Sequence, residues 1–318
     1  MPIRLILGPL RGITHFTFRN VFTEHFSGFD TAMAPFIPST RGNKASIRHF
    51  RDILPENNCQ LKIIPQLLGK DPDDFIRAAC QVHELGYDCV NWNLGCPMPT
   101  VTRKIRGSAL LAHPDRIRRF LDRVIPALPC GLSIKTRLGY ESPDDLLGLI
   151  PSLNAYPLTE LIIHPRTAPQ MYTPGTIDLE RFAQCLESSR HQVVYNGDIT
   201  NRDFFITLQR RFPSVSSWMI GRGAVANPFL AMQIKQSPLP FSPAARIRAF
   251  HDQLYSELRA LYRSQGPVLG AMKELWKLMQ ASFYTEGRTI TNILRAPCHQ
   301  AYEHAVEKLF STGKFIAA

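Results

Sequence analysis

The sequence predicts an α/β protein: a (β/α)₈ barrel followed by a small, all-helical C-terminal domain. Short β-rich runs alternate with longer amphipathic segments, which is the pattern of βαβ units around a parallel sheet. Eight such units fit into about 235 residues, close to the ~250 residues of a typical barrel. No Gly-x-Gly-x-x-Gly turn follows the first strand, which disfavours the alternative of a doubly wound sheet.

Each predicted element follows from local composition. Apolar, β-branched runs predict strands near 3–7, 29–34, 61–67, 87–93, 130–135, 159–164, 192–196 and 217–220. Amphipathic segments between them predict helices over 14–26, 44–52, 72–85, 114–127, 143–155, 178–190, 201–212 and 224–236. Several helices begin with proline and acidic residues in the first turn, as in Asp71–Asp74 and His113–Asp115.

A proline-rich segment separates the barrel from the rest of the chain. Residues 237–243 contain three prolines and predict a linker between a catalytic domain at 1–236 and a second domain at 244–318. The second domain is predicted to be helical because apolar residues from Ile247 to Leu261 recur at helical spacing. Trp276 and Met279 belong to a further helix. The region holds ten Lys and Arg against six Asp and Glu.

Composition indicates an ordinary globular protein of 318 residues, with 44% hydrophobic and 20% charged residues. No apolar run approaches the ~18 residues that span a bilayer, and the N-terminus is too short and too soon broken for a signal peptide. We therefore expect a cytoplasmic protein with no membrane contact. Seven dispersed cysteines without Cys-x-x-Cys or Cys/His clusters predict reduced, mostly buried thiols and no metal site. The sequence contains no signal for the oligomeric state, and we expect a monomer.

The charge balance is strongly basic, with 37 Lys and Arg against 26 Asp and Glu, a net charge of +11. Such a balance is compatible with a nucleic-acid partner, although a solvated basic surface is the alternative. Two stretches concentrate the charge. Residues 101–123 carry seven basic and two acidic residues, and residues 38–51 carry no acid beside four basic residues, namely Arg41, Lys44, Arg48 and Arg51.

Polar side chains follow the apolar runs where functional groups of a barrel collect, at the C-terminal ends of the strands. All these ends would converge on one mouth. The candidate residues there are Pro9, Gln66, Asn93, Cys96, Lys135, His164, Asn196, Asp198, Gly221 and Arg222.

The ends of the seventh and eighth predicted strands favour a phosphorylated ligand. Asn196–Asp198 and Gly221–Gly223 combine small residues with Arg222, and many barrels hold a phosphate at this position. Lys135 would place a cation against the middle of that ligand. His164 is either a ligand contact or a satisfied structural imidazole. The amides of Gln66 and Asn93 suit the edge of a heterocycle, such as a flavin or a pyrimidine.

Cys96 is the best candidate for acid–base or nucleophilic chemistry. An unperturbed thiol has a pKa of ~8.5, so it is mostly protonated near neutrality and can donate a proton. No His/Asp partner set accompanies it, which disfavours a protease-type nucleophile. The most economical assignment is a flavin-type reduction.

Nine segments of the predicted barrel form one ordered set of motifs: Leu7–Thr14, Pro65–Gly69, Asn93–Pro97, Gly107–Leu111, Ser133–Gly139, His164–Thr167, Gln170–Tyr172, Asn196–Ile199 and Met219–Ala224. Together they resemble the tRNA-dihydrouridine synthases, which are FMN-dependent barrels with a C-terminal helical RNA-binding domain. The stretch around Arg48–Pro55 is most similar to the bacterial C-type synthases.

The resemblance implies roles for the candidate residues. Cys96 would be the proton donor, Asn93 would lie at the flavin and the target base, and NADPH (or NADH) would reduce the FMN. The target uridine of the tRNA D-loop would have to be turned out into the pocket. The residues expected to hold FMN are Pro9, Gln66, Lys135, His164, Asn196, Asp198, Gly221 and Arg222. The residues expected to contact tRNA are Arg103, Lys104, Arg106, Arg137 and Arg166.

The chain also departs from the family pattern at three places. Arg11 adds a charge in the first-strand motif, Ala34–Phe36 replaces a segment that commonly contains Glu and Met, and Pro165 stands where the family has glycine. None of these removes a catalytic group. Two alternatives stay open: an FMN-dependent small-molecule dehydrogenase of the dihydroorotate type, and a non-catalytic tRNA-binding relative.

Overall fold

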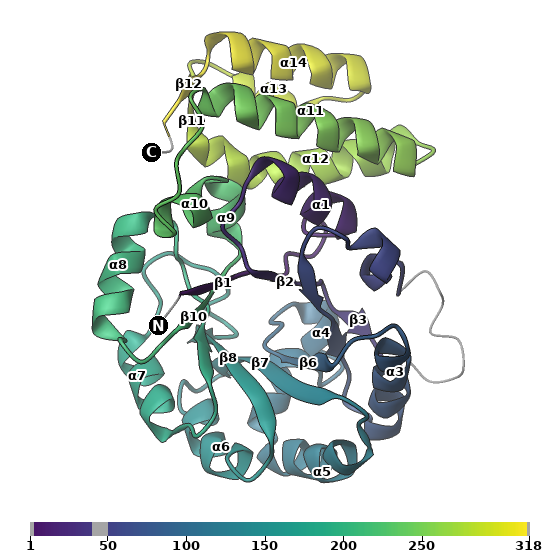
Figure 1. The fold of residues 1–318 in the computed structure, drawn as a ribbon, viewed down its shortest axis with the longest axis vertical. Coiled ribbons are helices and arrows are strands. Elements are labelled where there is room, and N and C mark those ends of the chain that lie inside the picture. Colours follow the sequence, from purple (N-terminus) through teal and green to yellow (C-terminus); the bar gives the residue numbers. More distant parts are fainter. Residues whose placement is uncertain (1–2, 40–49, 317–318) are drawn as a thin grey trace.

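The computed structural model describes residues 3–39 and 50–316, and these form a ring of strands inside a ring of helices, with a helical layer on one side (Figure 1). Most of the predicted helix 44–52, with Arg41, Lys44 and Arg48, lies outside the described residues. The strands of the ring are β1 (Arg4–Leu7), β2 (Thr31–Met33), β4 (Lys62–Ile64), β5 (Gln66–Leu68), β6 (Cys89–Leu94), β7 (Gly131–Gly139), β8 (Leu158–Thr167), β9 (Val193–Tyr195) and β10 (Ser217–Ile220).

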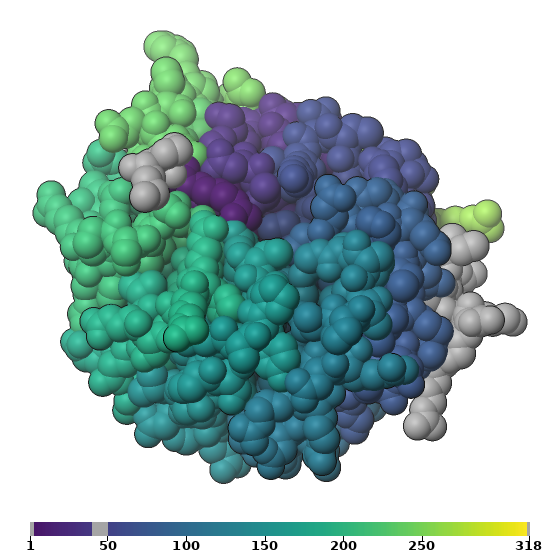
Figure 2. Space-filling model, turned by 60° about the horizontal axis from the view of Figure 1, so that its bottom comes forward, coloured from purple at the N-terminus to yellow at the C-terminus, as the bar shows by residue number. Residues whose placement is uncertain are grey.

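The sheet closes on itself. Neighbouring strands pair in parallel from β5 through β10 to β1, β2 and β4. The short strand β3 (Ile37–Pro38) also pairs with β5. Because only Pro65 separates β4 from β5, these two are one barrel strand, and the ring has eight members. The space-filling view shows the segments running in sequence order around the molecule, as a closed ring of βα units requires (Figure 2). The predicted barrel is confirmed.

Side chains fill the inside of the barrel. Ile6, Met33, Ile162, Val194 and Met219 form an apolar layer that is fully buried. Toward the N-terminal ends of the strands, Arg4 of β1 forms an ion pair with Glu160 of β8. The interior is therefore a packed core, and a ligand can enter only at the opposite end.

Helices cover the outside of the ring. They are α1 (Phe16–His25), α3 (Pro72–Glu84), α4 (Pro99–Thr102), α5 (Pro114–Val124), α6 (Asp145–Leu153), α7 (Leu179–Ser188), α8 (Arg202–Arg211), α9 (Arg222–Ala226) and α10 (Leu230–Ile234). Asp71, Asp178 and Asn201 cap α3, α7 and α8, each accepting a hydrogen bond from a backbone N–H in the first turn. Trp92 of β6 stacks on Phe120 of α5 at 3.9 Å between ring centroids.

Two elements differ from their predicted form. The helix predicted over 224–236 is two short helices, α9 and α10, because Pro228 lies between them and cannot donate the backbone hydrogen bond that a continuous helix needs. Strands β7 and β8 extend past their predicted ends at 135 and 164 to Gly139 and Thr167. The extension brings Arg137 and Arg166 into the strands instead of the loops.

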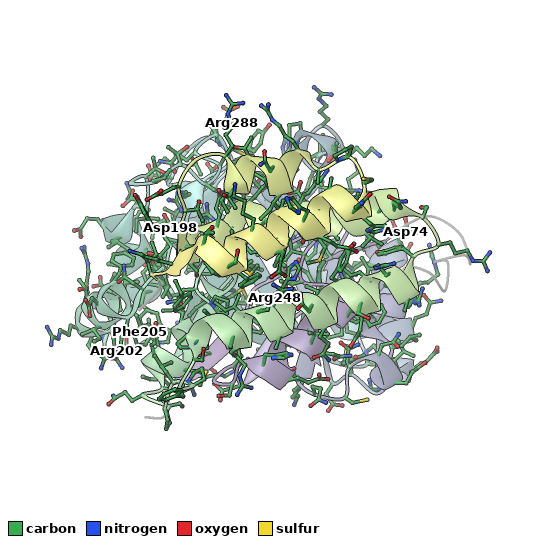
Figure 3. All side chains as sticks on the ribbon, turned by 90° about the horizontal axis from the view of Figure 1, so that it is seen from above. Asp74, Asp198, Arg202, Phe205, Arg248 and Arg288 are labelled. Carbon is green, nitrogen blue, oxygen red and sulfur yellow. The ribbon has the colours of Figure 1, made fainter. Side chains whose placement is uncertain are left out.

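The C-terminal region is helical, with α11 (Pro243–Leu261), α12 (Gln265–Met279), α13 (Thr289–Arg295) and α14 (His299–Thr312). Sequence patterns did not predict the two-stranded antiparallel sheet that joins β11 (Phe283–Tyr284) to β12 (Lys314–Phe315). In the view from above, Arg248 lies between α11 and α14 (Figure 3). Its guanidinium pairs with Glu307 at 2.9 Å and covers the ring of Phe310, which ties the two helices together.

An aromatic cluster joins this region to the barrel. Phe250 of α11 meets Phe18 and Phe22 of α1 and Phe26 directly after it, with centroid distances of 5.8, 5.8 and 5.2 Å. No helix of the described residues is long and apolar enough to cross a membrane. All seven cysteines lie in the described ranges and are free, but only Cys185 is fully buried, so the expectation of mostly buried thiols is wrong.

Candidate active site

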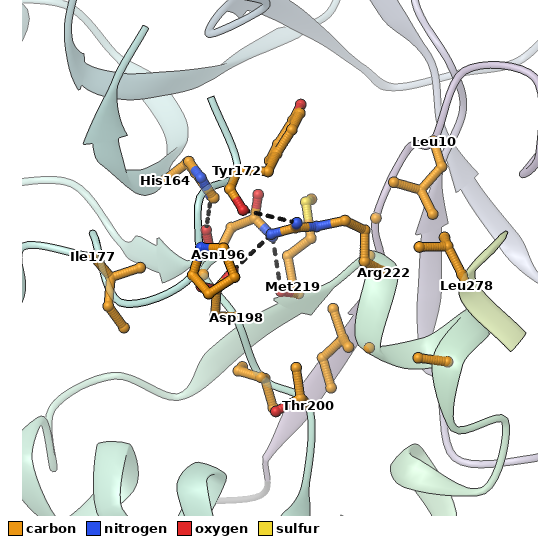
Figure 4. Close-up of a pocket in the computed structure, with 18 of the residues that line it drawn as sticks. Leu10, His164, Tyr172, Ile177, Asn196, Asp198, Thr200, Met219, Arg222 and Leu278 are labelled. Atoms are coloured by element: carbon orange, nitrogen blue, oxygen red, sulfur yellow. Dashed lines mark hydrogen bonds and ion pairs between the residues drawn. The ribbon is translucent and has the colours of Figure 1, made fainter. Parts of the chain in front are cut away.

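A cavity of about 610 Å³ opens at the C-terminal ends of the strands (Figure 4). Its walls include seven residues that the sequence singled out as cofactor contacts: Pro9, Lys135, His164, Asn196, Asp198, Gly221 and Arg222. Leu278 of α12 also lines it, so the helical region completes the wall. Of the predicted cofactor residues, Gln66 is not among the lining residues.

One carboxylate organises the side of the cavity formed by the loops after β9 and β10. Asp198 accepts hydrogen bonds from Arg222 at 2.7 Å and from Arg166, whose Nη1 lies 3.0 Å from Oδ1. Arg166 is completely buried and is also bound by Thr173 and Thr176. Arg222 keeps about a third of its side chain exposed. Asp198 therefore neutralises a buried arginine and orients a half-exposed one toward the cavity.

Tyr172 covers this arrangement from the loop after β8. Its ring receives Arg222 at 4.6 Å and Arg137 at 5.0 Å from the guanidinium carbon to the ring centroid. Tyr172 remains 43% exposed, so one side of its ring is open to solvent. Cation–π contact with two arginines fixes an aromatic surface at the edge of the cavity.

His164 is a neutral imidazole. Burial, and then the charges of Arg137 and Lys135, hold its pKa well below the ordinary value. Its Nδ1 donates to the carbonyl oxygen of Asn196 at 2.6 Å, and Nε2 faces Nη1 of Arg166 at 3.3 Å as an acceptor. The sequence left open whether His164 contacts a ligand or is a structural imidazole. The ring lines the cavity and is also held by internal partners, so its position is compatible with both.

Lys135 is a buried amine that lacks a counter-charge within the described residues. Burial, and then the charge of Arg137, lower its pKa to about 7, and only Cys96 acts in the opposite sense. No carboxylate of the described residues is among the groups that act on it. An ammonium group in this state is readily stabilised by an electron-rich ligand.

A chain of amide hydrogen bonds runs inside the barrel to Cys96. Ser133 accepts from Asn91, Asn91 accepts from Gln66, and Gln66 accepts from Asn93, each at 2.8 Å. Asn93 in turn accepts from the backbone N–H groups of Gly95 at 3.0 Å and Cys96 at 2.9 Å. Gln66 and Asn93 therefore set the conformation of the loop that carries the thiol.

Two further contacts hold that loop. Arg137 is buried and donates to the carbonyl oxygens of Gly95, Thr167 and Met171, each at 2.9 Å, so it bridges the loops after β6 and β8. Ser108 donates to the carbonyl oxygen of Cys96 through its backbone N–H and its hydroxyl. A Cβ at Gly107 would lie 2.7 Å from the same oxygen, and φ there is +59°. Only glycine allows the basic loop to approach Cys96 this closely.

The Cys96 thiol is kept protonated. Burial raises its pKa above the ordinary value, while a hydrogen bond from the backbone of Met98 and the charges of Arg137, Arg11 and Lys135 oppose the shift. The side chain is half-buried and not fully enclosed. A thiol in this state can donate a proton at neutral pH.

The arginines and lysine expected to meet RNA fall into two groups. Arg103 and Lys104 are exposed in the loop before Gly107, and Arg106 is half-buried with its Nε unpaired within the described residues. Arg137 and Arg166 are buried and have internal partners for their guanidinium groups. Both guanidinium groups are thus engaged inside the protein, although Arg137 also lines the cavity, and the contact of these two arginines with tRNA stays a prediction.

A sequence model of the family described as "Dihydrouridine synthase (Dus)" matches residues 6–308. The chain belongs to the dihydrouridine synthase family. The match covers the strand ends that form the cavity and most of the helical region.

Relatives in bacteria support the family assignment. The chain is 30% identical over 240 residues to the "tRNA-dihydrouridine(16) synthase" of Ralstonia nicotianae, covering 73% of this chain and 72% of the relative. It is 28% identical over 232 residues to "tRNA-dihydrouridine synthase B" of Pasteurella multocida, covering 71% and 67%. The predicted enzyme class is confirmed: a flavin-dependent oxidoreductase of the dihydrouridine synthase family that acts on a CH–CH group.

Solved structures with the same barrel are more distant. Morphinone reductase aligns with a TM-score of 0.51 at 13% identity, covering 76% of this chain and 88% of that one. The old yellow enzyme from Trypanosoma cruzi aligns with a TM-score of 0.51 at 12% identity, covering 74% and 89%. At this distance the likeness shows the fold alone.

Other residues of this dihydrouridine synthase site are not predicted as contacts by the sequence, among them Tyr172, Thr200 and Leu278. Tyr172 and Thr200 follow barrel strands, so their position is the signal that could identify them. Leu278 carries no such signal, because it lies in α12, 58 residues beyond Ile220, the last residue of the last barrel strand. Within residues 3–39 and 50–316 no group of three or more His, Cys, Asp or Glu could hold a metal ion.

Proposed function

We propose that this protein reduces the C5=C6 bond of a D-loop uridine in tRNA, with FMN as cofactor and NADPH as the source of electrons. The observation that carries the proposal is one cavity that joins an uncompensated Lys135 and an oriented Arg222 to the loop of a protonated Cys96 thiol. Family membership supports the substrate and the reaction.

The residues present fit FMN. A volume of about 610 Å³ lies within the ~300–1,000 Å³ of cofactor sites. Arg222 and the small residue Gly221 would hold the phosphate, and Asp198 would keep Arg222 in place. Lys135 would face electron-rich atoms of the flavin ring, with His164 and Asn196 beside it. Gln66 would act indirectly, through Asn93.

The reaction needs a hydride at C6 and a proton at C5, because C5 is the carbon next to the C4 carbonyl. FMN reduced by NADPH supplies the hydride when it is bound. Cys96 supplies the proton, since its thiol remains protonated in this environment. Asn93 and Arg137 hold the Cys96 loop so that the thiol keeps one position relative to the cavity.

The partner is tRNA, and the basic surface supports this choice. Arg103 and Lys104 are exposed beside the Cys96 loop, and the chain carries a net charge of +11. We assign residues 1–236 to catalysis and residues 244–318 to tRNA binding, joined by 237–243. We infer that the protein acts as a monomer in the cytoplasm.

The consumption of NADPH tests this proposal against its alternatives. Purified protein should carry bound flavin and should oxidise NADPH faster when a tRNA transcript is added. A dihydroorotate-type enzyme would instead respond to orotate, and a non-catalytic relative would bind tRNA without any turnover. Acceleration by orotate but not by tRNA, or the absence of flavin, would refute the proposal.

A further inference from the structure

Two of the places where this chain departs from the family pattern are in contact with each other. Arg11 follows β1 and Phe36 follows β2, and the Arg11 guanidinium carbon lies 5.6 Å from the centroid of the Phe36 ring. Both β1 and β2 end at the mouth of the barrel, and Leu10, the neighbour of Arg11, lines the cavity. The departures therefore form one local structure, a guanidinium held on an aromatic ring at the rim of the site.

The Arg11 side chain is exposed and has no acidic partner. It takes part in no ion pair within residues 3–39 and 50–316. Residues 40–49 contain no Asp or Glu. A guanidinium that rests on a ring keeps its N–H groups free at the edge of its plane, and this geometry suits the bidentate binding of a phosphate.

The charge of Arg11 also acts on the proposed proton donor, because it is one of the charges that lower the pKa of the Cys96 thiol. A base that enters the cavity to reach Cys96 brings the phosphates of its own nucleotide to the rim, because the backbone of an extruded nucleotide stays outside the pocket. An anion from the substrate thus arrives where Arg11 lies unpaired.

We propose that Arg11, held against Phe36, binds a backbone phosphate of the RNA beside the uridine that enters the cavity. The inference rests on the proposed function and adds a substrate contact particular to this chain. It has a consequence for the chemistry. The free positive charge of Arg11 lowers the pKa of Cys96 and so favours its thiolate. A bound phosphate neutralises that charge, so substrate binding helps to keep the thiol protonated for proton transfer.

The test compares Arg11→Ala with Arg190→Ala, a matched control with the same loss of charge. Arg190 is exposed and precedes β9, so it lies at the opposite end of the barrel. The measurement is kcat and KM for a tRNA transcript at several salt concentrations, with flavin content as the check on folding. Arg11→Ala should raise KM about tenfold with kcat nearly unchanged. The slope of log(kcat/KM) against log[salt] should become shallower by about 1.

Two further variants sharpen the result. Arg11→Lys keeps the charge, so it should retain the wild-type salt slope with a smaller rise in KM. Phe36→Leu removes the ring and should raise KM by a few-fold without changing the slope. Arg190→Ala should match the wild type in every constant.

Two results would overturn the inference alone: Arg11→Ala indistinguishable from Arg190→Ala, or a fall in kcat with unchanged KM and salt slope. The second result would mean that Arg11 acts on the thiol and not on the RNA. Wild-type protein that carries flavin but reduces no tRNA would overturn the proposed function itself, so the two failures can be told apart.

Discussion

At the scale of single residues, the protonation states of two side chains govern the proposed chemistry. Burial raises the pKa of Cys96 and lowers that of Lys135, because each shift favours the neutral form of the group. The thiol thereby stays an acid at neutral pH. The amine becomes a group whose charge depends on what binds beside it.

Cys96 is expected to extend activity toward alkaline pH. The protonated thiol is the active form, so kcat should be constant through neutrality and fall only above the ordinary thiol range, at pH above ~8.5. Cys96→Ala should reduce kcat on the order of 10²–10⁴-fold and leave the flavin absorption of the protein unchanged. A full rate in this variant would exclude Cys96 as the proton donor.

The lowered pKa of Lys135 should make flavin binding depend on pH. Its pKa is about 7 in the cavity, so it is charged below pH 7 and loses the proton as pH rises through that value. If the flavin ring prefers the charged amine, the affinity of apoprotein for riboflavin should fall up to about tenfold per unit above pH 7. Riboflavin is the right probe because it has no phosphate that titrates. Quenching of its fluorescence gives the affinity, and Lys135→Met should abolish the slope.

At the scale of elements, close contacts between strand-end loops fix the shape of the cavity. The first turn of α9, which follows β10, packs against the loop after β9 at Gly223, where an added Cβ would lie 1.9 Å from the carbonyl oxygen of Ile199. The backbone cannot yield at this point without moving Arg222 away from Asp198.

Gly223→Ala should therefore lower the melting temperature and weaken FMN binding, at a cost of about 1–3 kcal/mol in stability. The control is Gly270→Ala in α12, where an added Cβ meets nothing within 4 Å. That change should stabilise the protein by about 0.5–1 kcal/mol, because alanine favours a helix over glycine. Equal effects of the two changes on melting and flavin affinity would disprove the packing argument.

The barrel strands and most residues of the cavity wall could be predicted from the sequence, for physical reasons. Alternation of apolar runs and amphipathic segments located all eight barrel strands, and the ends of those strands supplied most of the cavity wall. The direction of a side chain could not be predicted. Arg166 reads as a free cation after a strand, yet it points into the protein because β8 continues to Thr167. The break of the helix at Pro228 was visible in the sequence and follows from the missing N–H.

At the scale of the whole molecule, the helical region and the barrel share one site. Leu278 of α12 lines the cavity, and Phe250 of α11 packs into the aromatic cluster of α1. Such contacts between distant segments leave no periodic signal in a sequence. This is why the helices of this region could be predicted from the spacing of their apolar residues, while their part in the cavity could not.

Phe250→Ala should loosen this docking. Removing a fully buried ring costs about 3–5 kcal/mol, so the melting temperature should fall and tRNA should bind less tightly. Phe241→Ala is the control, because that ring lies fully exposed on the segment before α11. Calorimetry of both variants decides the point, and an unchanged melting curve for Phe250→Ala would contradict the docking.

Whether this chain makes dihydrouridine in tRNA is decided by the mass of its product. An unmodified tRNA transcript is incubated with the purified protein, FMN and NADPH, and its nucleosides are analysed by mass spectrometry. We expect one uridine of the D-loop to gain two hydrogen atoms with the wild-type protein and none with Cys96→Ala. Transcripts that all remain unchanged, although the protein holds a flavin that NADPH reduces, would contradict the proposed function.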